Sequence, residues 1–369
     1  MDDIKFWVAL NRVPQLGTVR FRRLETYFKQ LENAWGATPV QLKEAGIEDR
    51  VAREIVRIRG EVSPDGEMER LSREGVQTVN WHHPDYPPRL KEIADPPPVL
   101  YYKGSILPQD ERAVAVVGTR GPTAYGREAA AAITKDLARN EITIVSGLAR
   151  GIDAIAHRAA LEAGGRTIAV LAGGLDKVYP KEHTKLAQQA QEQGAVVSEY
   201  PLGVQPLPKN FPRRNRLISG MSLGTLVVEA GEASGAKWTV QHALEQNREV
   251  FCVPGSIFSP VSRLTNHLIQ EGAKLVSNCT DVLEELNLTA VAHQVQMPFP
   301  VAAEDDGEAL LLGHLDDEPK HIDDIRRRAS LPITAVNTLL TMLELKGMVR
   351  QVGCMHYIRI REVIPAYGS

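Results

Sequence analysis

The chain has 369 residues, with 43 Lys and Arg against 46 Asp and Glu, and a formal net charge of −3 at pH 7. This length exceeds one ordinary domain, and a hydrophobic fraction of 43% excludes a wholly disordered chain. The near-neutral charge excludes a nonspecific polycation, so any binding of nucleic acid must rely on locally concentrated charge.

The cysteines and the N-terminus indicate the broad class of the protein. The three cysteines form no Cys-x-x-Cys pair, so we expect neither a disulfide scaffold nor a structural zinc site. The opening MDDIKFWVAL lacks a basic region before a long apolar run, which argues against a signal peptide. No apolar run approaches about 18 residues, so we expect no membrane span. Together these features predict a cytoplasmic protein.

Residues 1–80 are predicted to be helical. Apolar residues recur at helical spacing, and turns containing Gly17 and Gly46 separate the periodic segments. Helical hairpins of this kind, in a helix-hairpin-helix or SAM-like domain, can present backbone amides to a phosphate. They are also an ordinary way to build a small bundle, and the sequence leaves both interpretations open. A proline-rich connector follows in residues 82–98.

Residues 81–286 are predicted to form a Rossmann-like α/β domain. Short runs rich in β-branched residues alternate with amphipathic segments. This alternation is typical of a doubly wound parallel sheet covered by helices on both faces. The predicted strands are residues 113–118, 142–147, 167–174, 195–199, 225–230, 249–255 and 273–276.

The C-terminal part contains a linker and a third domain. Residues 287–305 lose periodicity, and residues 306–369 read as three short helices followed by a two-stranded wing, which is a winged-helix pattern. Winged helices bind duplex DNA in some proteins and dock onto proteins in others. The acidic composition of this segment does not decide between the two.

Glycines and cations follow the predicted strands at their carboxyl ends. Ligands bind at this edge of an open parallel sheet. Glycine lets backbone amides approach a phosphate closely, and helix N-termini add positive potential. The sequence therefore predicts an anion site with cations from Arg120, Arg150, Lys177 and Lys181. A further basic stretch, residues 206–216, contains no acid.

Several catalytic classes lack their motifs. The first strand is not followed by GxGxxG with an acid after the second strand, so we expect no nicotinamide or flavin cofactor. A Walker A loop and a GxSxG elbow are also absent. One enzymatic alternative remains, because Thr225 and Glu229 resemble part of the PGGxGTxxE signature of nucleotide phosphoribohydrolases of the lysine-decarboxylase-like group. The leading PGG of that signature is missing here.

Seven ordered motifs carry a stronger resemblance. The chain resembles the DNA-processing protein A (DprA/Smf) family over about residues 85–286, and the terminal domains fit its extended architecture. The motifs are GTRGPTAYG (118–126), SGLARGIDAIAH (146–157), AVLAGGLDKVYPKEH (169–183), SEYPLG (198–203), FPRRNRLISGMS (211–222), VVEAGEASG (227–235) and VPGSI (253–257). Two stretches depart from the family pattern: Leu264 replaces a usual Gly, and residues 235–240 replace GSxxTA.

The resemblance implies a function without catalysis. Family members bind single-stranded DNA, protect incoming strands during natural transformation and load the RecA recombinase, acting as homodimers through the Rossmann-like domain. Arg120 and Lys181 are then the implied main strand contacts, and Phe211 contributes an aromatic face for stacking. The implied strand-binding set is Gly118, Thr119, Arg120, Ser146, Gly147, Lys181, Lys209, Phe211, Arg213, Arg214, Asn215 and Arg216. The recombinase-contact surface, the role of the terminal domains and the competence of the host stay open.

Overall fold

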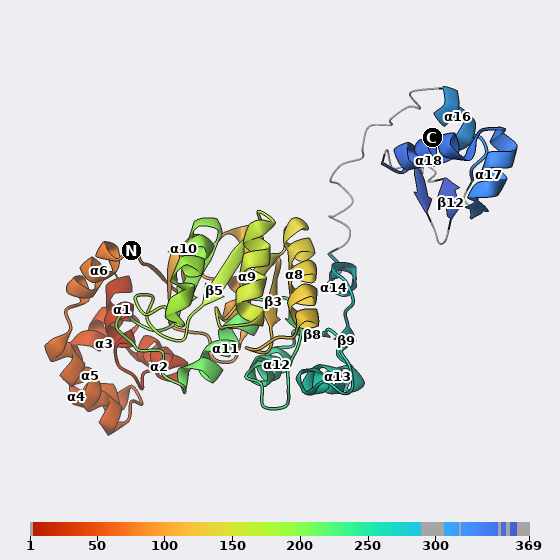
Figure 1. The fold of residues 1–369 in the computed structure, drawn as a ribbon. Coiled ribbons are helices and arrows are strands. Elements are labelled where there is room, and N and C mark those ends of the chain that lie inside the picture. Colours follow the sequence, from red (N-terminus) through yellow and green to blue (C-terminus); the bar gives the residue numbers. More distant parts are fainter. Residues whose placement is uncertain (1–2, 289–305, 317–318, 346–347, 352–354, 360–369) are drawn as a thin grey trace, which may run out of the picture. The chain divides into compact units, whose positions relative to one another are not determined.

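The structure is a computed structural model, and it describes residues 3–288, 306–316, 319–345, 348–351 and 355–359 (Figure 1). Contacts divide the chain into two compact units, residues 1–292 and residues 293–369. The predicted linker, residues 287–305, lies outside the described residues from 289 onward. No described helix is long and apolar enough to span a bilayer.

Six helices form the N-terminal part of the first unit. They are α1 (Ile4–Asn11), α2 (Thr18–Phe28), α3 (Leu31–Gly36), α4 (Pro39–Glu44), α5 (Asp49–Glu61) and α6 (Pro64–Arg73). Local sequence sets their starts, since Thr38 forms a capping box with Gln41 and Ser63 caps α6 through the Gly66 amide. The predicted helical character of this region is confirmed.

A nine-stranded sheet forms the centre of the first unit. Its order is β1-β2-β6-β5-β4-β3-β7-β8-β9, and the seven strands from β6 to β9 run parallel. The strands are β1 (Gln77–Asn80), β2 (Val99–Gly104), β3 (Ala113–Val117), β4 (Thr143–Ser146), β5 (Thr167–Val170), β6 (Ala195–Ser198), β7 (Gly224–Val227), β8 (Glu249–Cys252) and β9 (Lys274–Leu275). All seven predicted strands are present.

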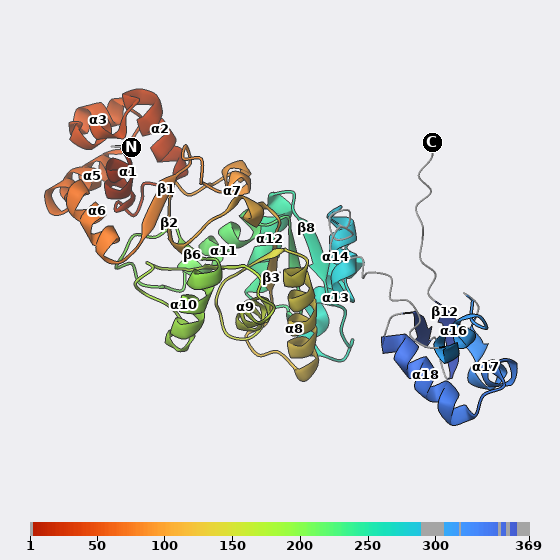
Figure 2. The same ribbon diagram turned by 90° about the horizontal axis from the view of Figure 1, so that it is seen from above.

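Helices cover both faces of the sheet (Figure 2). On one face α9 packs between α8 and α10, and on the other α11 packs against α12. The main helices are α8 (Ala124–Arg139), α9 (Ile152–Glu162), α10 (Thr184–Gln193), α11 (Asn210–Gly220), α12 (Ala236–Glu245) and α13 (Arg263–Gln270). Shorter helices are α7 (Pro88–Glu92), α14 (Cys279–Glu285), η1 (Pro108–Glu111), η2 (Lys181–His183) and η3 (Pro260–Ser262). The doubly wound Rossmann-like prediction is therefore confirmed.

The chain reverses its direction of winding between β3 and β7. From β3 it adds β4, β5 and β6 on one side, and then it crosses to add β7, β8 and β9 on the other. Consecutive loops diverge at such a point and leave a crevice beyond the strand ends. The loops that follow β3 and β7 therefore form the expected ligand site.

The N-terminal helices pack directly onto the sheet. One hydrophobic core cluster runs from Trp7 in α1 to Val196 in β6. Polar contacts cross the same boundary, because the Asn11 side-chain amide donates to the Glu199 carbonyl oxygen (3.1 Å) and the Arg12 guanidinium donates to the Leu202 carbonyl oxygen (2.7 Å). The sequence prediction missed two strands here. The pair β1 and β2 extends the sheet antiparallel beyond β6, so residues 77–80 are not helical.

The second unit has the winged-helix arrangement. It contains α16 (Asp306–Leu312), β10 (Lys320–His321), α17 (Ile322–Ala329), α18 (Ile333–Leu345), β11 (Val349–Gln351) and β12 (His356–Arg359). The strands form a sheet of order β10-β12-β11, and the helices enclose a small apolar core. The winged-helix prediction is confirmed, with the short strand β10 added to the two expected wing strands.

Candidate nucleic-acid interface

A cleft of about 870 Å³ opens at the point where the winding reverses. Its walls come from the loop after β3, the loop after β7, helix α11, the first turn of α12, and the segment around η3. The main lining residues are Gly118, Thr119, Arg120, Ala149, Asp153, Tyr179, Phe211, Arg214, Asn215, Glu232, Trp238 and Arg263. The site thus lies where the sheet topology places it.

Backbone contacts fix the loop that carries Arg120. The Thr119 amide donates to the Glu229 carbonyl oxygen (2.6 Å), and the Thr119 carbonyl oxygen accepts from the Ile152 amide (3.2 Å). Gly151 makes this approach possible, because its φ is +77° and a Cβ there would lie 2.3 Å from the Thr119 carbonyl oxygen. The loop is therefore pinned between β7 and the start of α9.

Glu229 is a buried support for the same loop. Its carboxylate accepts from the Thr123 amide (2.9 Å) and from the Thr123 hydroxyl (2.6 Å). Thr123 in turn caps α8 through the Gly126 amide (3.1 Å). Thr225 is buried, and its hydroxyl has no hydrogen-bond partner in the structure. The two residues of the hydrolase alternative, Thr225 and Glu229, are therefore buried, and both carboxylate oxygens of Glu229 accept hydrogen bonds from Thr123.

Two guanidinium groups flank one aromatic ring. The Cζ atoms of Arg120 and Arg214 lie 5.9 and 5.7 Å from the centre of the Phe211 ring. Tyr179 meets the same ring edge-on, with 5.7 Å between the ring centres. Arg120 is exposed, and Phe211 is partly exposed at the start of α11. This arrangement places a partly exposed aromatic ring beside a solvent-accessible cation.

Arg214 supplies a buried charge below the cleft surface. Its guanidinium donates to the carbonyl oxygens of Gly147 (2.9 Å) and Val170. Burial lowers the pKa of Arg214 to about 10, and Asp153 opposes this shift, so Arg214 is charged at neutral pH. Asp153 accepts from the Gly147 amide (3.1 Å), and its burial raises the pKa of that carboxyl group. Gly147 is required here, because a Cβ would lie 2.7 Å from an Arg214 nitrogen.

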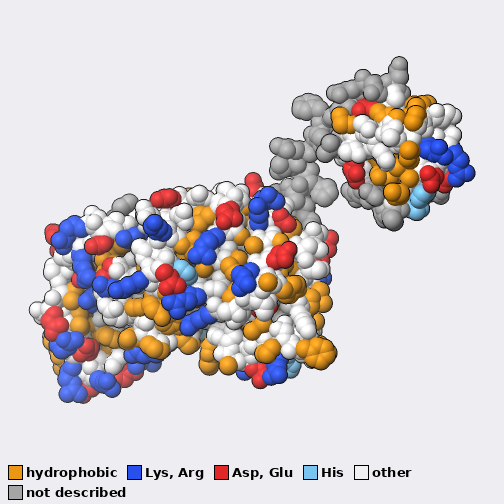
Figure 3. All heavy atoms as spheres, in the orientation of Figure 1, with side chains coloured by type: hydrophobic (Ala, Val, Ile, Leu, Met, Phe, Trp, Pro, Cys, Tyr) orange, Lys and Arg blue, Asp and Glu red, His pale blue; other side chains and the backbone are white. Residues whose placement is uncertain are grey.

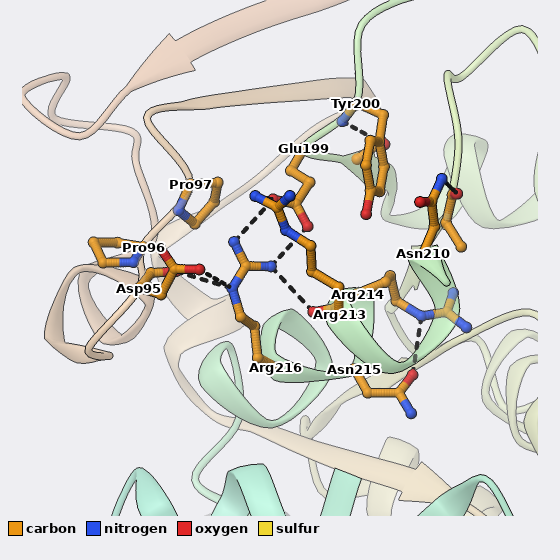
Figure 4. A network of polar contacts seen from close by, with 12 residues as sticks. Asp95, Pro96, Pro97, Glu199, Tyr200, Asn210, Arg213, Arg214, Asn215 and Arg216 are labelled. Carbon is orange, nitrogen blue, oxygen red and sulfur yellow. Dashed lines mark hydrogen bonds and ion pairs between the residues drawn. The ribbon is translucent and has the colours of Figure 1, made fainter. Parts of the chain in front are cut away.

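Arg216 is placed differently from its prediction. Its guanidinium forms two hydrogen bonds with the Glu199 carboxylate (2.7 and 2.8 Å), and both side chains are buried. Figure 4 shows Arg216 between Glu199 and Asp95, on a different side of α11 from Arg214. Arg216 therefore acts as a structural residue beside the cleft, which corrects its prediction as a strand-binding residue. Arg213 is half-exposed and lies 3.4 Å from the same carboxylate.

The predicted contacts fall into three groups. Six of them line the cleft: Gly118, Thr119, Arg120, Phe211, Arg214 and Asn215. Lys181, Lys209 and Arg213 are exposed but are not part of its lining. The remaining three, Ser146, Gly147 and Arg216, are buried and are not part of the lining. The Ser146 hydroxyl donates to the Val116 carbonyl oxygen (2.6 Å), so this side chain supports β4, which corrects its prediction as a strand contact.

Sequence reasoning missed several lining residues. Asp153 and Tyr179 belong to the motifs at residues 146–157 and 169–183, in the segments that follow β4 and β5. Their position after these strands was the signal that could have identified them as lining residues. Trp238 and Arg263 come from segments that were noted only for departing from the family pattern. Figure 3 shows basic side chains interspersed with acidic ones on the visible face of the first unit. Attraction for a polyanion must therefore come from the local arrangement at the cleft.

Fold and site together define a class of protein. It is a Rossmann-like α/β protein whose cleft at the winding reversal presents guanidinium groups, an aromatic ring and backbone turns, and it carries a winged helix in a second unit. The chain belongs to the DNA recombination-mediator protein A family, whose model matches residues 77–287. A second family model, the DprA winged helix domain, matches residues 295–353.

Individual relatives agree with this assignment. Protein Smf of Synechocystis is 35% identical over 390 residues, which cover 96% of this chain and 98% of that protein. The DNA processing protein DprA of Bacillus subtilis is 45% identical over 58% of this chain and 72% of that protein. The solved DprA of Streptococcus pneumoniae is similar over 76% of this chain and 97% of its own, with 36% identity and a TM-score of 0.66.

A second solved relative comes from Helicobacter pylori. Its structure is described as giving insights into the single-stranded DNA binding mode of DNA processing protein A. It covers 57% of this chain and 95% of its own, with 29% identity and a TM-score of 0.52.

Proposed function

We propose that this chain binds single-stranded DNA in the cleft at the winding reversal and, as a homodimer, delivers the strand to the RecA recombinase during natural transformation. The residues that line the cleft support the strand-binding part of this proposal. The RecA and dimer parts rest on family membership and the resemblance of the motifs. The single-stranded DNA binding mode described for the Helicobacter pylori relative supports an unpaired strand as the ligand class.

The observation that carries the proposal is the grouping of Arg120, Phe211 and Arg214. Binding of an unpaired strand without sequence preference needs cations along the backbone and rings on which bases stack. Arg120 is the exposed cation beside the Phe211 ring, and its planar guanidinium can hold a phosphate through two hydrogen bonds. The buried charge of Arg214 adds positive potential below the ring.

The same geometry argues against the hydrolase alternative. Cleavage of an N-glycosidic bond needs a carboxylate that reaches the substrate. Glu229 is 2% exposed, and its carboxylate accepts two hydrogen bonds from Thr123. We therefore propose a binding protein without hydrolase activity, in which Glu229 shapes the Arg120 loop.

The test compares Arg120→Ala with Arg139→Ala for binding of a fluorescent oligothymidylate. Arg139 is a matched control, because it is exposed at the other end of α8, about 24 Å along the helix from the cleft. We expect Arg120→Ala to weaken binding at least about tenfold and to reduce the slope of log affinity against log salt by about 0.7. Equal affinities for the two variants and the wild type would contradict the proposal.

A further inference from the structure

Trp238 is a large aromatic side chain that lines the cleft and is not explained by packing. It lies in the first turn of α12, and 49% of its surface is exposed. The other three tryptophans of the chain, Trp7, Trp35 and Trp81, are all buried in the N-terminal core. Trp238 is thus set apart from them by both position and exposure.

The ring of Trp238 lacks the partners that Trp7 and Trp81 have. Trp7 stacks on Phe21 and donates its indole N–H to Asp3 (3.2 Å), and Trp81 donates to Glu25 (3.2 Å). Within residues 3–288, Trp238 makes no aromatic or cation–π contact, and its indole N–H has no hydrogen-bond partner. Its ring face is therefore available to a ligand in the cleft.

Trp238 and Phe211 line the same cleft from two helices that pack together. The two rings occupy the first turns of α12 and α11, which pack together, and the Asn215 side-chain amide donates to the Gly235 carbonyl oxygen (3.4 Å). Packed helices have axes about 8–10 Å apart. Stacked bases rise about 3.4 Å per nucleotide, so rings carried by two helices with this axis separation suit different bases of one strand rather than a single base.

The local charge indicates a base rather than a phosphate. Glu232 and Arg263 are both exposed in the lining of the cleft, and their opposite charges offset each other. By contrast, the cations flank Phe211 at the other aromatic position. These offsetting charges give a phosphate no net attraction there, whereas an uncharged base can still stack on the exposed Trp238 ring.

We propose that Trp238 is a second stacking platform, which holds a different unpaired base of the strand from the one that stacks on Phe211. This inference rests on the proposed binding of single-stranded DNA. It extends the site across the α11–α12 pair and adds a contact from the segment that departs from the family pattern.

Tryptophan fluorescence provides the direct test, because Trp238 is the exposed tryptophan of this chain. An oligothymidylate of about twelve nucleotides should quench the fluorescence of the wild type, whereas a thymidine dinucleotide should quench it less. Trp238→Phe should abolish the quenching and keep the affinity, since a ring remains. Trp238→Ala should weaken binding about fivefold or more. Leu244→Ala, two turns further along α12, is the control and should bind normally.

The outcomes separate this inference from the proposed function. Binding that depends on Arg120, without fluorescence quenching and with unchanged affinity for Trp238→Ala, would overturn the second platform and leave the proposed function intact. An absence of any binding to the labelled oligothymidylate would overturn both. Circular dichroism of Trp238→Ala checks that its fold is retained.

Discussion

Removal of the Glu199 carboxylate should destabilise the first unit strongly. The side chains of Glu199 and Arg216 are 5% and 7% exposed, and two hydrogen bonds join them. Burial opposes the charge of Arg216, but the Glu199 carboxylate outweighs this and raises the pKa of the guanidinium. Glu199→Ala leaves that charge buried, which typically costs about 3–5 kcal/mol. We expect about 3 kcal/mol, because Arg216 keeps its contacts with Asp95.

The assay is urea unfolding followed by circular dichroism. Glu182→Ala is the control, because Glu182 forms two hydrogen bonds of 2.8 Å with Arg150 and both side chains are more than half exposed. That variant should unfold at the wild-type urea concentration. The double variant Glu199→Leu, Arg216→Met should recover much of the lost stability, because it removes the uncompensated charge. Equal unfolding midpoints for Glu199→Ala and Glu182→Ala would refute the reasoning.

Two further substitutions test the support of the cleft and the buried histidine. Gly151→Ala should weaken binding of oligothymidylate as much as Arg120→Ala does, because a Cβ would collide with the Thr119 carbonyl oxygen; wild-type affinity would show that the loop tolerates displacement. Burial lowers the pKa of His157 to about 3, with smaller effects from His183, Arg214 and Arg158. The unfolded chain therefore binds a proton below about pH 6.5 that the folded chain does not, and His157 should reduce stability by up to about 1.4 kcal/mol per pH unit as the pH falls from there towards 3. Urea unfolding of His157→Gln should show a correspondingly shallower loss, and an unchanged pH dependence would contradict this.

The sequence was sufficient for the central fold because its signals are local. The β-branched runs and the glycines that follow them predicted all seven parallel strands and the edge at which the cleft opens. Strands β1 and β2 were missed, because residues 77–80 follow a helical segment and residues 99–104 follow a proline-rich connector. Their identity as strands depends on antiparallel pairing with β6, which lies far away in the sequence.

The candidate site was predicted only in part, for a related reason. A motif shows which residues occur together but not on which side of a helix each one lies. Arg214 and Arg216 are two positions apart on α11, so they project in different directions, one to the cleft and the other to Glu199. The role of Glu199 as the partner of Arg216 depends on how β6 and α11 meet, and no local pattern encodes that. Trp238 was similarly hidden in a segment that departs from the family pattern.

The central claim concerns where an unpaired strand lies on this protein. A crystal structure of the full chain with bound oligothymidylate tests it most directly. The account predicts a phosphate within hydrogen-bonding distance of the Arg120 guanidinium and a base against the Phe211 ring. A strand bound elsewhere on the chain, with the Arg120 cleft empty, would contradict it.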